Sequence, residues 1–146
     1  MWHKYKILGQ KENIELLRYG AMPVPSYATL HLSYSCNQHC RSCAYAAFNK
    51  DKFIPEEAAA FNYVNQLIDY GVKAFDISGG GDPSTLPYIV PLIEEILKAG
   101  CNYGFVTNGW KLSKELIKLI SSTATYVRVS LETGDPVIYS RYKRVS

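Results

Sequence analysis

The sequence predicts an α/β fold in which parallel strands alternate with helices. Short apolar segments with β-prone residues alternate with longer segments whose apolar residues recur at helical spacing. Proline or a capping residue precedes these helical segments, and glycine follows two of them. Four strand-then-helix units follow one another, near the roughly 30 residues that a βαβ crossover takes. This order predicts a parallel sheet with right-handed connections, which either closes toward a barrel or opens as a doubly wound fold.

The first two units have clear boundaries. Residues 28–34 are apolar and β-prone, and we expect them to form the first strand. A helix is expected from Pro55 to Gly71, because proline and acidic residues begin the segment and glycine follows it. Residues 72–78 are expected to form the second strand, and a helix beginning at about Pro87 follows.

The last two units repeat this pattern. Residues 102–107 are the expected third strand, and Ser113 is expected to cap the next helix. Residues 126–131 are the expected fourth strand, and residues 134–136 (GDP) open a fourth helix. The sequence therefore contains four βα units.

Residues 1–26 lie outside this alternation, and we interpret them as an N-terminal extension. They contain a short expected helix at 12–19, to which no role is assigned. Residues 27–146 are expected to form one core domain, because 146 residues with 47% hydrophobic composition fit roughly one domain.

Composition excludes several classes of partner. A net charge of +3 from 16 basic and 13 acidic residues gives no concentrated polycation, so neither nucleic acid nor an anionic membrane is indicated. No apolar run approaches the roughly 20 residues of a membrane-spanning helix, and no secretory signal is recognisable. We therefore expect a cytoplasmic protein.

Three of the four cysteines lie within eight residues, directly after the first expected strand. Cys36, Cys40 and Cys43 would present three thiolates, which favour iron–sulfur clusters or zinc. Structural zinc requires four ligands and would have to recruit His39 or the distant Cys101. An iron–sulfur cluster with three protein thiolates keeps one iron open for another ligand. The residues alone leave both interpretations open.

Three further loops stand at the ends of the later strands. Residues 79–83 (GGGDP) follow the second strand, residues 107–109 (TNG) the third, and Ser130 and Glu132 the fourth. Taken singly, each is also compatible with an ordinary turn or strand end. Parallel α/β folds build their sites at the carboxyl ends of strands, so we expect all four loops to meet.

The cysteine spacing CxxxCxxC resembles the signature of the radical S-adenosylmethionine (radical SAM) superfamily. This resemblance implies a [4Fe-4S] cluster on Cys36, Cys40 and Cys43, whose open iron binds the amino and carboxylate groups of SAM. It also implies reductive cleavage of SAM to methionine and a 5′-deoxyadenosyl radical, which takes a hydrogen atom from substrate.

The remaining loops resemble the same family. Residues 80–83 resemble its GGEP motif, which contacts the SAM amino group, with Asp82 in the glutamate position. The family usually has an aromatic residue where this chain has Ser42, and we expect Tyr45 to substitute near the adenine. The resemblance thus implies these cofactor-binding residues: Tyr45, Gly79, Gly80, Gly81, Asp82, Pro83, Asn108, Ser130 and Glu132.

Several other polar residues receive simpler interpretations. His39 and Arg41 are expected to be solvated, with shielding of the cluster or reception of a redox partner as the alternative. Arg141, Lys143 and Arg144 are expected to form a solvated helix face.

The resemblance also sets the expected architecture and partners. The family's TIM-like (β/α) barrel typically has six βα units, and this chain supplies four, so a partial barrel is expected, either a fragment or one completed by a partner chain. Expected partners are SAM, an electron donor such as flavodoxin or ferredoxin, and a substrate that the sequence does not identify. The alternatives are a non-catalytic zinc-binding module and an inactive SAM-binding relic.

Overall fold

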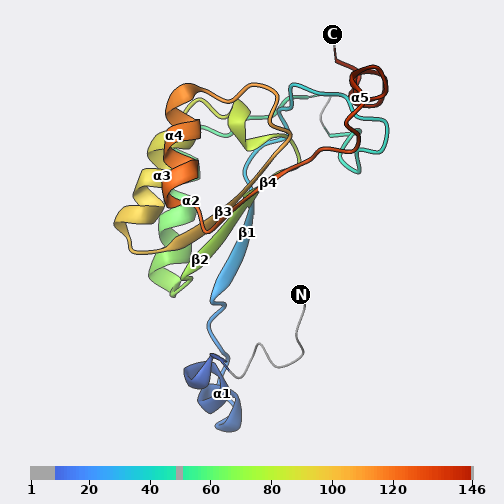
Figure 1. The fold of residues 1–146 in the computed structure, drawn as a ribbon. Helices are drawn as coiled ribbons and strands as arrows, with labels where there is room; N and C mark the ends of the chain where they lie inside the picture. The colour runs from blue at the N-terminus through green and yellow to red at the C-terminus, as the bar shows by residue number, and fades with distance from the viewer. Residues whose placement is uncertain (1–8, 49–50, 146) are drawn as a thin grey trace.

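The centre of the fold is a four-stranded parallel sheet in the order β1-β2-β3-β4. The structure is a computed structural model that describes residues 9–48 and 51–145. The strands are β1 (Tyr27–His31), β2 (Ala74–Ser78), β3 (Asn102–Thr107) and β4 (Tyr126–Val129). Every neighbouring pair is parallel, and a helical segment separates each strand from the next (Figure 1). The predicted α/β class, a partial barrel of four βα units, is confirmed.

Three helices cover one face of the sheet: α2 (Glu57–Tyr70), α3 (Ile89–Lys98) and α4 (Lys114–Thr123) (Figure 1). Alternate side chains of β2 and β3 point toward these helices, and burying each one fully contributes about 1.5 to 3 kcal/mol. No helix in the described part of the chain is long and apolar enough to cross a membrane. The largest fully buried apolar side chains of this core are Tyr103, Phe75, Phe105, Leu30, Ile77, Leu92, Ile93 and Ile96.

Local signals set the helix ends, as the sequence predicts. The Ser113 side chain accepts a hydrogen bond from the Leu116 backbone N–H at 3.0 Å, which caps α4. The residue after α2 is Gly71, whose φ of +109° lies in the left-handed region that glycine tolerates. Asp135 caps α5 (Pro136–Lys143) by accepting two backbone N–H bonds.

β1 is shorter at its carboxyl end than the predicted 28–34. The strand stops at His31, and the following segment pairs with the loop after β2. The carbonyl of Ser33 accepts from the Gly81 N–H at 2.8 Å, and the carbonyl of Ser35 accepts from the Asp82 N–H at 2.9 Å. These bonds turn the chain toward the loop that follows β2. β4 also ends two residues earlier than predicted, at Val129.

The face of the sheet opposite the helices carries polar side chains. Asp76 of β2, Gly104 of β3 and Tyr126 of β4 occupy one row across the sheet. The Tyr126 hydroxyl donates to the Asp76 carboxylate at 2.5 Å, across the intervening strand. A Cβ atom on Gly104 would lie 2.2 Å from the Tyr126 ring, so only glycine leaves room for this contact.

α1 (Lys11–Arg18) forms close to the predicted 12–19 and lies beyond the amino-terminal ends of the strands (Figure 1). None of its residues is buried. Polar contacts join it to the segment before β1, including a bond from Asn13 Nδ2 to the Val24 carbonyl at 3.0 Å. Residues 1–8 of the predicted extension lie outside the described residues.

α5 does not join the helix layer. It lies beside the cysteine loop, residues 36–43, at the carboxyl end of the sheet (Figure 1). The backbone N–H groups of His39 and Arg41 donate to the carbonyls of Lys143 and Tyr142, at 3.0 and 3.1 Å. The last turn of α5 therefore fixes the backbone of the cysteine loop.

Candidate functional site

A pocket of about 220 Å³ lies at the carboxyl ends of the strands, and we call it the strand-end pocket. Segments that follow all four strands contribute to its lining, as expected for a parallel α/β sheet. Pro83 does not line it and is buried in the short 3₁₀ turn η2 (Pro83–Thr85). The predicted site residues that line it are Cys36, Cys40, Cys43, Tyr45, Gly79, Gly80, Gly81, Asp82, Asn108, Ser130 and Glu132.

Gln38 organises the cysteine loop from within. Its side chain is 1% exposed, and its amide nitrogen donates to the Tyr139 hydroxyl of α5 at 3.1 Å. Its backbone N–H donates to Cys36 Sγ at 3.4 Å, and its amide oxygen accepts from the Cys40 thiol at 3.7 Å. Cys36, Cys40 and Cys43 themselves are partly exposed to the pocket.

Burial raises the pKa of two of the thiols. For Cys36, desolvation is the largest cause, and the Gln38 N–H only partly opposes it. For Cys40, desolvation again raises the pKa, and the nearby Lys143 charge opposes it. Metal ligation requires thiolates, so binding of a cation at this loop would release protons.

The three glycines after β2 are required by close packing. A Cβ atom on Gly80 would lie 2.2 Å from the Tyr34 ring, and one on Gly81 would lie 1.9 Å from the Ser35 carbonyl oxygen. None of residues 79–81 has a positive φ. Gly80 and Gly81 therefore let this loop approach the segment after β1, which carries the cysteines, and a positive φ is not what requires glycine here.

Asp82 links the loops after β2 and β3. Its side chain is buried, and its carboxylate accepts from the backbone N–H and the hydroxyl of Ser84 at 3.0 and 2.6 Å. It also accepts from the Thr107 hydroxyl at 3.0 Å and from the Asn108 backbone N–H at 2.5 Å. The carboxylate thus serves the chain's own donors, and the predicted contact of this motif with SAM stays a prediction.

Asn108 extends this network to the cysteine loop. Its side-chain nitrogen donates to Asn37 Oδ1 at 2.7 Å and lies 3.7 Å from Cys36 Sγ. Its side-chain oxygen accepts from the Trp110 backbone N–H at 2.8 Å, which forms the turn after β3. A continuous set of hydrogen bonds therefore runs from Asp82 through Asn108 to the first cysteine.

Lys143 and Glu132 form an ion pair at the edge of the strand-end pocket, with 2.7 Å between Nζ and Oε2. The Lys143 side chain is only 3% exposed, against 38% for Glu132. Burial lowers the pKa of Lys143, but the hydrogen bond with Glu132 and nearby negative charges outweigh it, so the pKa is raised overall. The expectation of a solvated Lys143 is wrong, because α5 turns this side chain toward the cysteine loop.

Tyr45 lines the strand-end pocket, as the aromatic residue predicted to replace the one missing at Ser42. Its ring packs edge-on against His31, with ring centroids 5.7 Å apart. Ser42 forms a hydrogen bond with the Tyr142 hydroxyl of α5. Adenine contact by Tyr45 stays a prediction.

Sequence reasoning did not assign Gln38, Thr107 or Lys143 to this site. Thr107 belongs to the TNG segment, which resembles a family motif and is also compatible with an ordinary turn, but only Asn108 of that segment was expected to bind the cofactor. Gln38 is a polar residue inside the cysteine loop, yet nothing in its neighbours signals burial. The burial of Lys143 depends on the packing of α5 against the cysteine loop, about 100 residues earlier in the chain. The sequence holds no local signal for that contact.

The ligand side chains of the strand-end pocket fit a metal cluster held by three thiolates. Among the described residues, no three ligand side chains are already arranged to close around one metal ion. Cys101 is buried just before β3, at the opposite end of the sheet, and its thiol donates to the Val72 carbonyl at 3.4 Å. His39 lines a different pocket. Three thiols therefore share the strand-end pocket, and neither candidate for a fourth ligand does.

Fold and site together define an α/β protein with a three-thiol site above a parallel sheet. The sequence model of the Radical SAM superfamily matches residues 30–146. The chain belongs to this superfamily.

Two curated relatives illustrate the similarity in sequence. An S-adenosylmethionine-dependent nucleotide dehydratase of Flammeovirga pacifica is 29% identical over 116 residues, 75% of this chain and 39% of the relative. A probable GTP 3′,8-cyclase of Methanococcus maripaludis is 32% identical over 118 residues, 77% of this chain and 38% of the relative. This chain thus spans about two fifths of the length of these relatives.

Solved structures share the fold. Streptococcus suis SuiB bound to the precursor peptide SuiA superposes with a TM-score of 0.73 at 19% identity, covering 99% of this chain and 33% of SuiB. SuiB bound to S-adenosylmethionine gives a TM-score of 0.70 at 17% identity, covering 95% of this chain and 33% of SuiB. At these identities the likeness concerns the fold.

Proposed function

We propose that this chain is the cluster-binding and SAM-binding part of a radical SAM enzyme. Cys36, Cys40 and Cys43 would hold a [4Fe-4S] cluster in the strand-end pocket. The observation that carries the proposal is that three thiols and the loops after β2, β3 and β4 line one pocket. An isolated zinc site would not require loops from every strand of the sheet around it.

A reduced cluster held there would supply one electron to SAM, breaking its sulfur–carbon bond to give methionine and a 5′-deoxyadenosyl radical that abstracts hydrogen from substrate. The chain's own residues would bind and orient SAM. Gly79, Gly80 and Gly81 present backbone groups to the pocket without side chains, and Ser130 offers a hydroxyl for polar contact.

Asp82 and Asn108 would act by holding the loops of the pocket in place. Asp82 fixes the loop after β2 against the turn after β3, and Asn108 donates toward Cys36. Such outer contacts orient metal ligands and tune the bound group. Glu132, paired with Lys143, would contribute its remaining oxygen to the SAM side of the pocket.

The proposal includes the cytoplasm as the working compartment and a flavodoxin- or ferredoxin-type electron donor. The similar proteins include an S-adenosylmethionine-dependent nucleotide dehydratase, a probable GTP 3′,8-cyclase and a protein bound to a precursor peptide. These substrates differ in class, so the proposal extends to hydrogen abstraction and names no substrate.

The test is anaerobic reconstitution of the full-length protein with iron and sulfide, followed by dithionite reduction in the presence of SAM. We expect a brown protein with about four irons per chain that forms 5′-deoxyadenosine. Cys43→Ala should lose the iron, whereas the matched control Cys101→Ala should retain it, because Cys101 lies at the opposite end of the sheet.

Two outcomes would contradict this proposal in different ways. A colourless protein that contains one zinc and forms no 5′-deoxyadenosine would indicate the zinc-binding module instead. A protein that assembles the cluster and binds SAM without cleaving it would indicate the inactive relic.

A further inference from the structure

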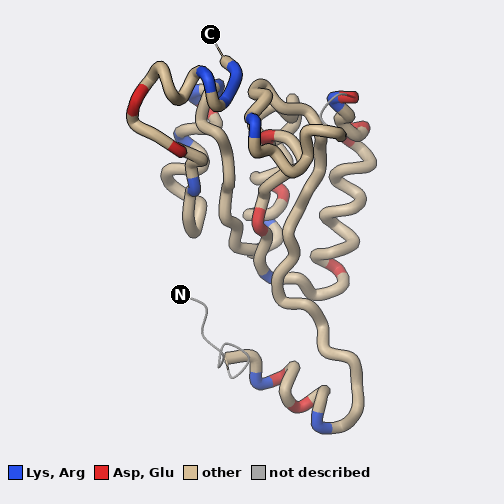
Figure 2. The backbone as a smooth tube through the Cα atoms, turned by 90° about the vertical axis from the view of Figure 1, so that its right-hand side faces the viewer, with Lys and Arg blue, Asp and Glu red and all other residues tan. Residues whose placement is uncertain are grey.

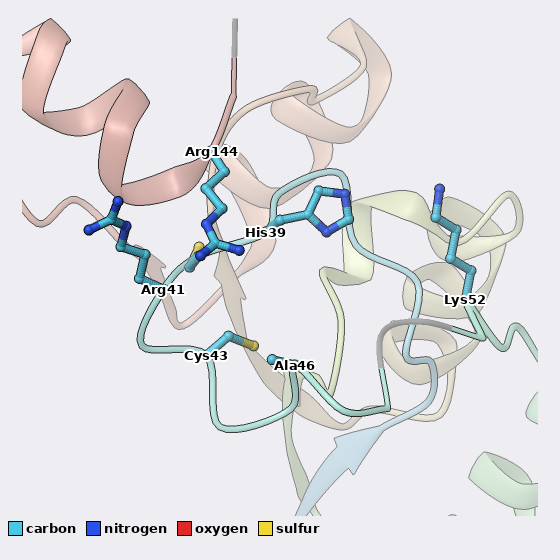
Figure 3. Close-up of a pocket in the computed structure, with 7 residues that line it drawn as sticks. His39, Arg41, Cys43, Ala46, Lys52 and Arg144 are labelled. Carbon is cyan, nitrogen blue, oxygen red and sulfur yellow. The ribbon is translucent and has the colours of Figure 1, made fainter.

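A second pocket, of about 360 Å³, lies on the cysteine loop and is strongly basic. Figure 3 shows Arg41 and Arg144 on one side, Lys52 on the other and His39 between them, with Cys43 and Ala46 below. We call it the basic pocket. It is lined by His39, Cys40, Arg41, Cys43, Ala46, Lys52 and Arg144.

Within the described part of the chain, the basic pocket and the strand-end pocket share two lining residues, Cys40 and Cys43. One pocket is lined by cations, and the other contains the glycine loop and the strand ends. The two thiols therefore stand between the predicted SAM site and a separate surface. A molecule seated in the basic pocket would touch two of the three proposed cluster ligands.

The charge of this surface is one-sided. Among the residues that the structure describes, no acidic side chain lines the basic pocket. Glu132, an acidic residue of the adjoining strand-end pocket, is already paired with Lys143. Arg41 also borders a neighbouring hollow with Arg141, so the cationic surface continues along α5. Figure 2 shows Lys and Arg gathered beside the C-terminal end of the chain.

This arrangement fits a protein better than a small anion. Sites for small ligands enclose most of the ligand surface within converging groups. Here His39, Arg41, Lys52 and Arg144 are all exposed and come from three separate segments of the chain. Transient redox complexes, in contrast, use small interfaces that depend on complementary charge.

We propose that the basic pocket is the docking surface for a small acidic protein that donates one electron. The inference rests on the proposed function, because it requires an electron acceptor held by Cys40 and Cys43. In the transfer, the donor is oxidised by one electron and the acceptor is reduced by one, with no bond made or broken. The same electron is then available for SAM cleavage.

The first test measures binding, which does not depend on turnover. The full-length, cluster-reconstituted protein is titrated with an oxidised flavodoxin of net negative charge at low and high salt. We expect the double variant Arg41→Glu/Arg144→Glu to weaken binding roughly tenfold or more at low salt, and to reduce its salt dependence. The matched control is Lys114→Glu/Lys118→Glu on α4, which makes the same charge change at exposed positions of the helix layer and should bind nearly normally.

The second test compares two reductants in the same proteins. Reduction by reduced flavodoxin should slow in the pocket variant, whereas reduction by dithionite should be unchanged, since dithionite needs no docking surface. Unchanged dithionite reduction also shows that the variant is folded and loaded.

The outcomes separate the two proposals. Normal dithionite-driven 5′-deoxyadenosine formation, with equal flavodoxin binding by the pocket and control variants, would overturn the docking surface alone. Phosphate competing with flavodoxin more strongly than chloride at equal ionic strength would also overturn it, in favour of a small-anion site. No 5′-deoxyadenosine from the unaltered protein with dithionite would overturn the proposed function, and the electron transfer with it.

Discussion

The Asp82 carboxylate accepts the backbone N–H of Asn108 at 2.5 Å, although the two residues follow different strands. The side chain of Asn108 in turn donates to Asn37 and approaches Cys36. One buried acid therefore fixes the relative positions of the loops after β2 and β3 and, through Asn108, of the cysteine loop.

Asp82→Asn should destabilise the protein by about 2 to 4 kcal/mol. The asparagine is nearly the same size, but its amide NH₂ must face a backbone donor, either that of Ser84 or that of Asn108. Urea denaturation measures the loss, with Asp69→Asn at an exposed position of α2 as the matched control. Equal stability of these two variants would show that the buried network contributes nothing.

Gly81→Ala should disrupt the strand-end pocket, because the added Cβ would lie 1.9 Å from the backbone oxygen of Ser35. The segment carrying Cys36 must then move, and we expect loss of both stability and iron retention. Gly134→Ala is the control, since nothing lies within 4 Å of the Cβ added there. Thermal unfolding and iron analysis of the two variants check this, and identical behaviour would contradict the packing role of Gly81.

Truncating the two partners of the Lys143–Glu132 pair should have unequal effects. Glu132→Ala leaves a 3% exposed ammonium without its carboxylate and should cost about 3 kcal/mol. Lys143→Met leaves a carboxylate that is 38% exposed and can hydrate, so it should cost less. The free energy of unfolding is measured for both variants and for the double variant, whose cost should be well below the sum of the two. Equal losses of unfolding free energy in the two single variants, or a double variant whose loss equals their sum, would contradict the unequal burial of the two side chains.

Stability should fall above about pH 10, with part of the fall due to Tyr126. Desolvation and the hydrogen bond to Asp76 raise the pKa of Tyr126 above its ordinary value of 10.0. A raised pKa means that the folded state binds this proton more tightly, so its contribution is present below pH 10 and is lost as pH rises toward the folded pKa. Tyr126→Phe removes the group, and its unfolding free energy should decline less steeply between pH 9 and about pH 11. Parallel pH profiles for the two proteins would contradict this.

Elements defined by local signals could be predicted closely from the sequence. β3 spans Asn102–Thr107, as apolar β-prone residues between two glycine-containing turns indicate, and Ser113 caps α4 as expected. The order of motifs along the chain also predicted which loops would contribute to one pocket, because parallel strands bring their carboxyl ends together. These inferences need only residue type and spacing.

Features that depend on distant contacts could not be predicted in this way. β1 ends at His31 because Ser33 and Ser35 pair with a loop more than 40 residues later. The role of Gly81 is to make room for Ser35, which the glycine itself does not reveal. Lys143 is buried only because α5 packs on the cysteine loop instead of on the sheet.

The bonds between α5 and the cysteine loop also bear on how the protein is made. The loop leaves the ribosome early, but its backbone partners, Tyr142 and Lys143, are synthesised about 100 residues later. Until they emerge, the N–H groups of His39 and Arg41 lack these partners, and the part of the loop around Cys40 lacks the support of α5. Metal loading should therefore follow synthesis of α5, so that nascent chains halted before residue 136 bind iron far more weakly than chains in which residue 143 has emerged.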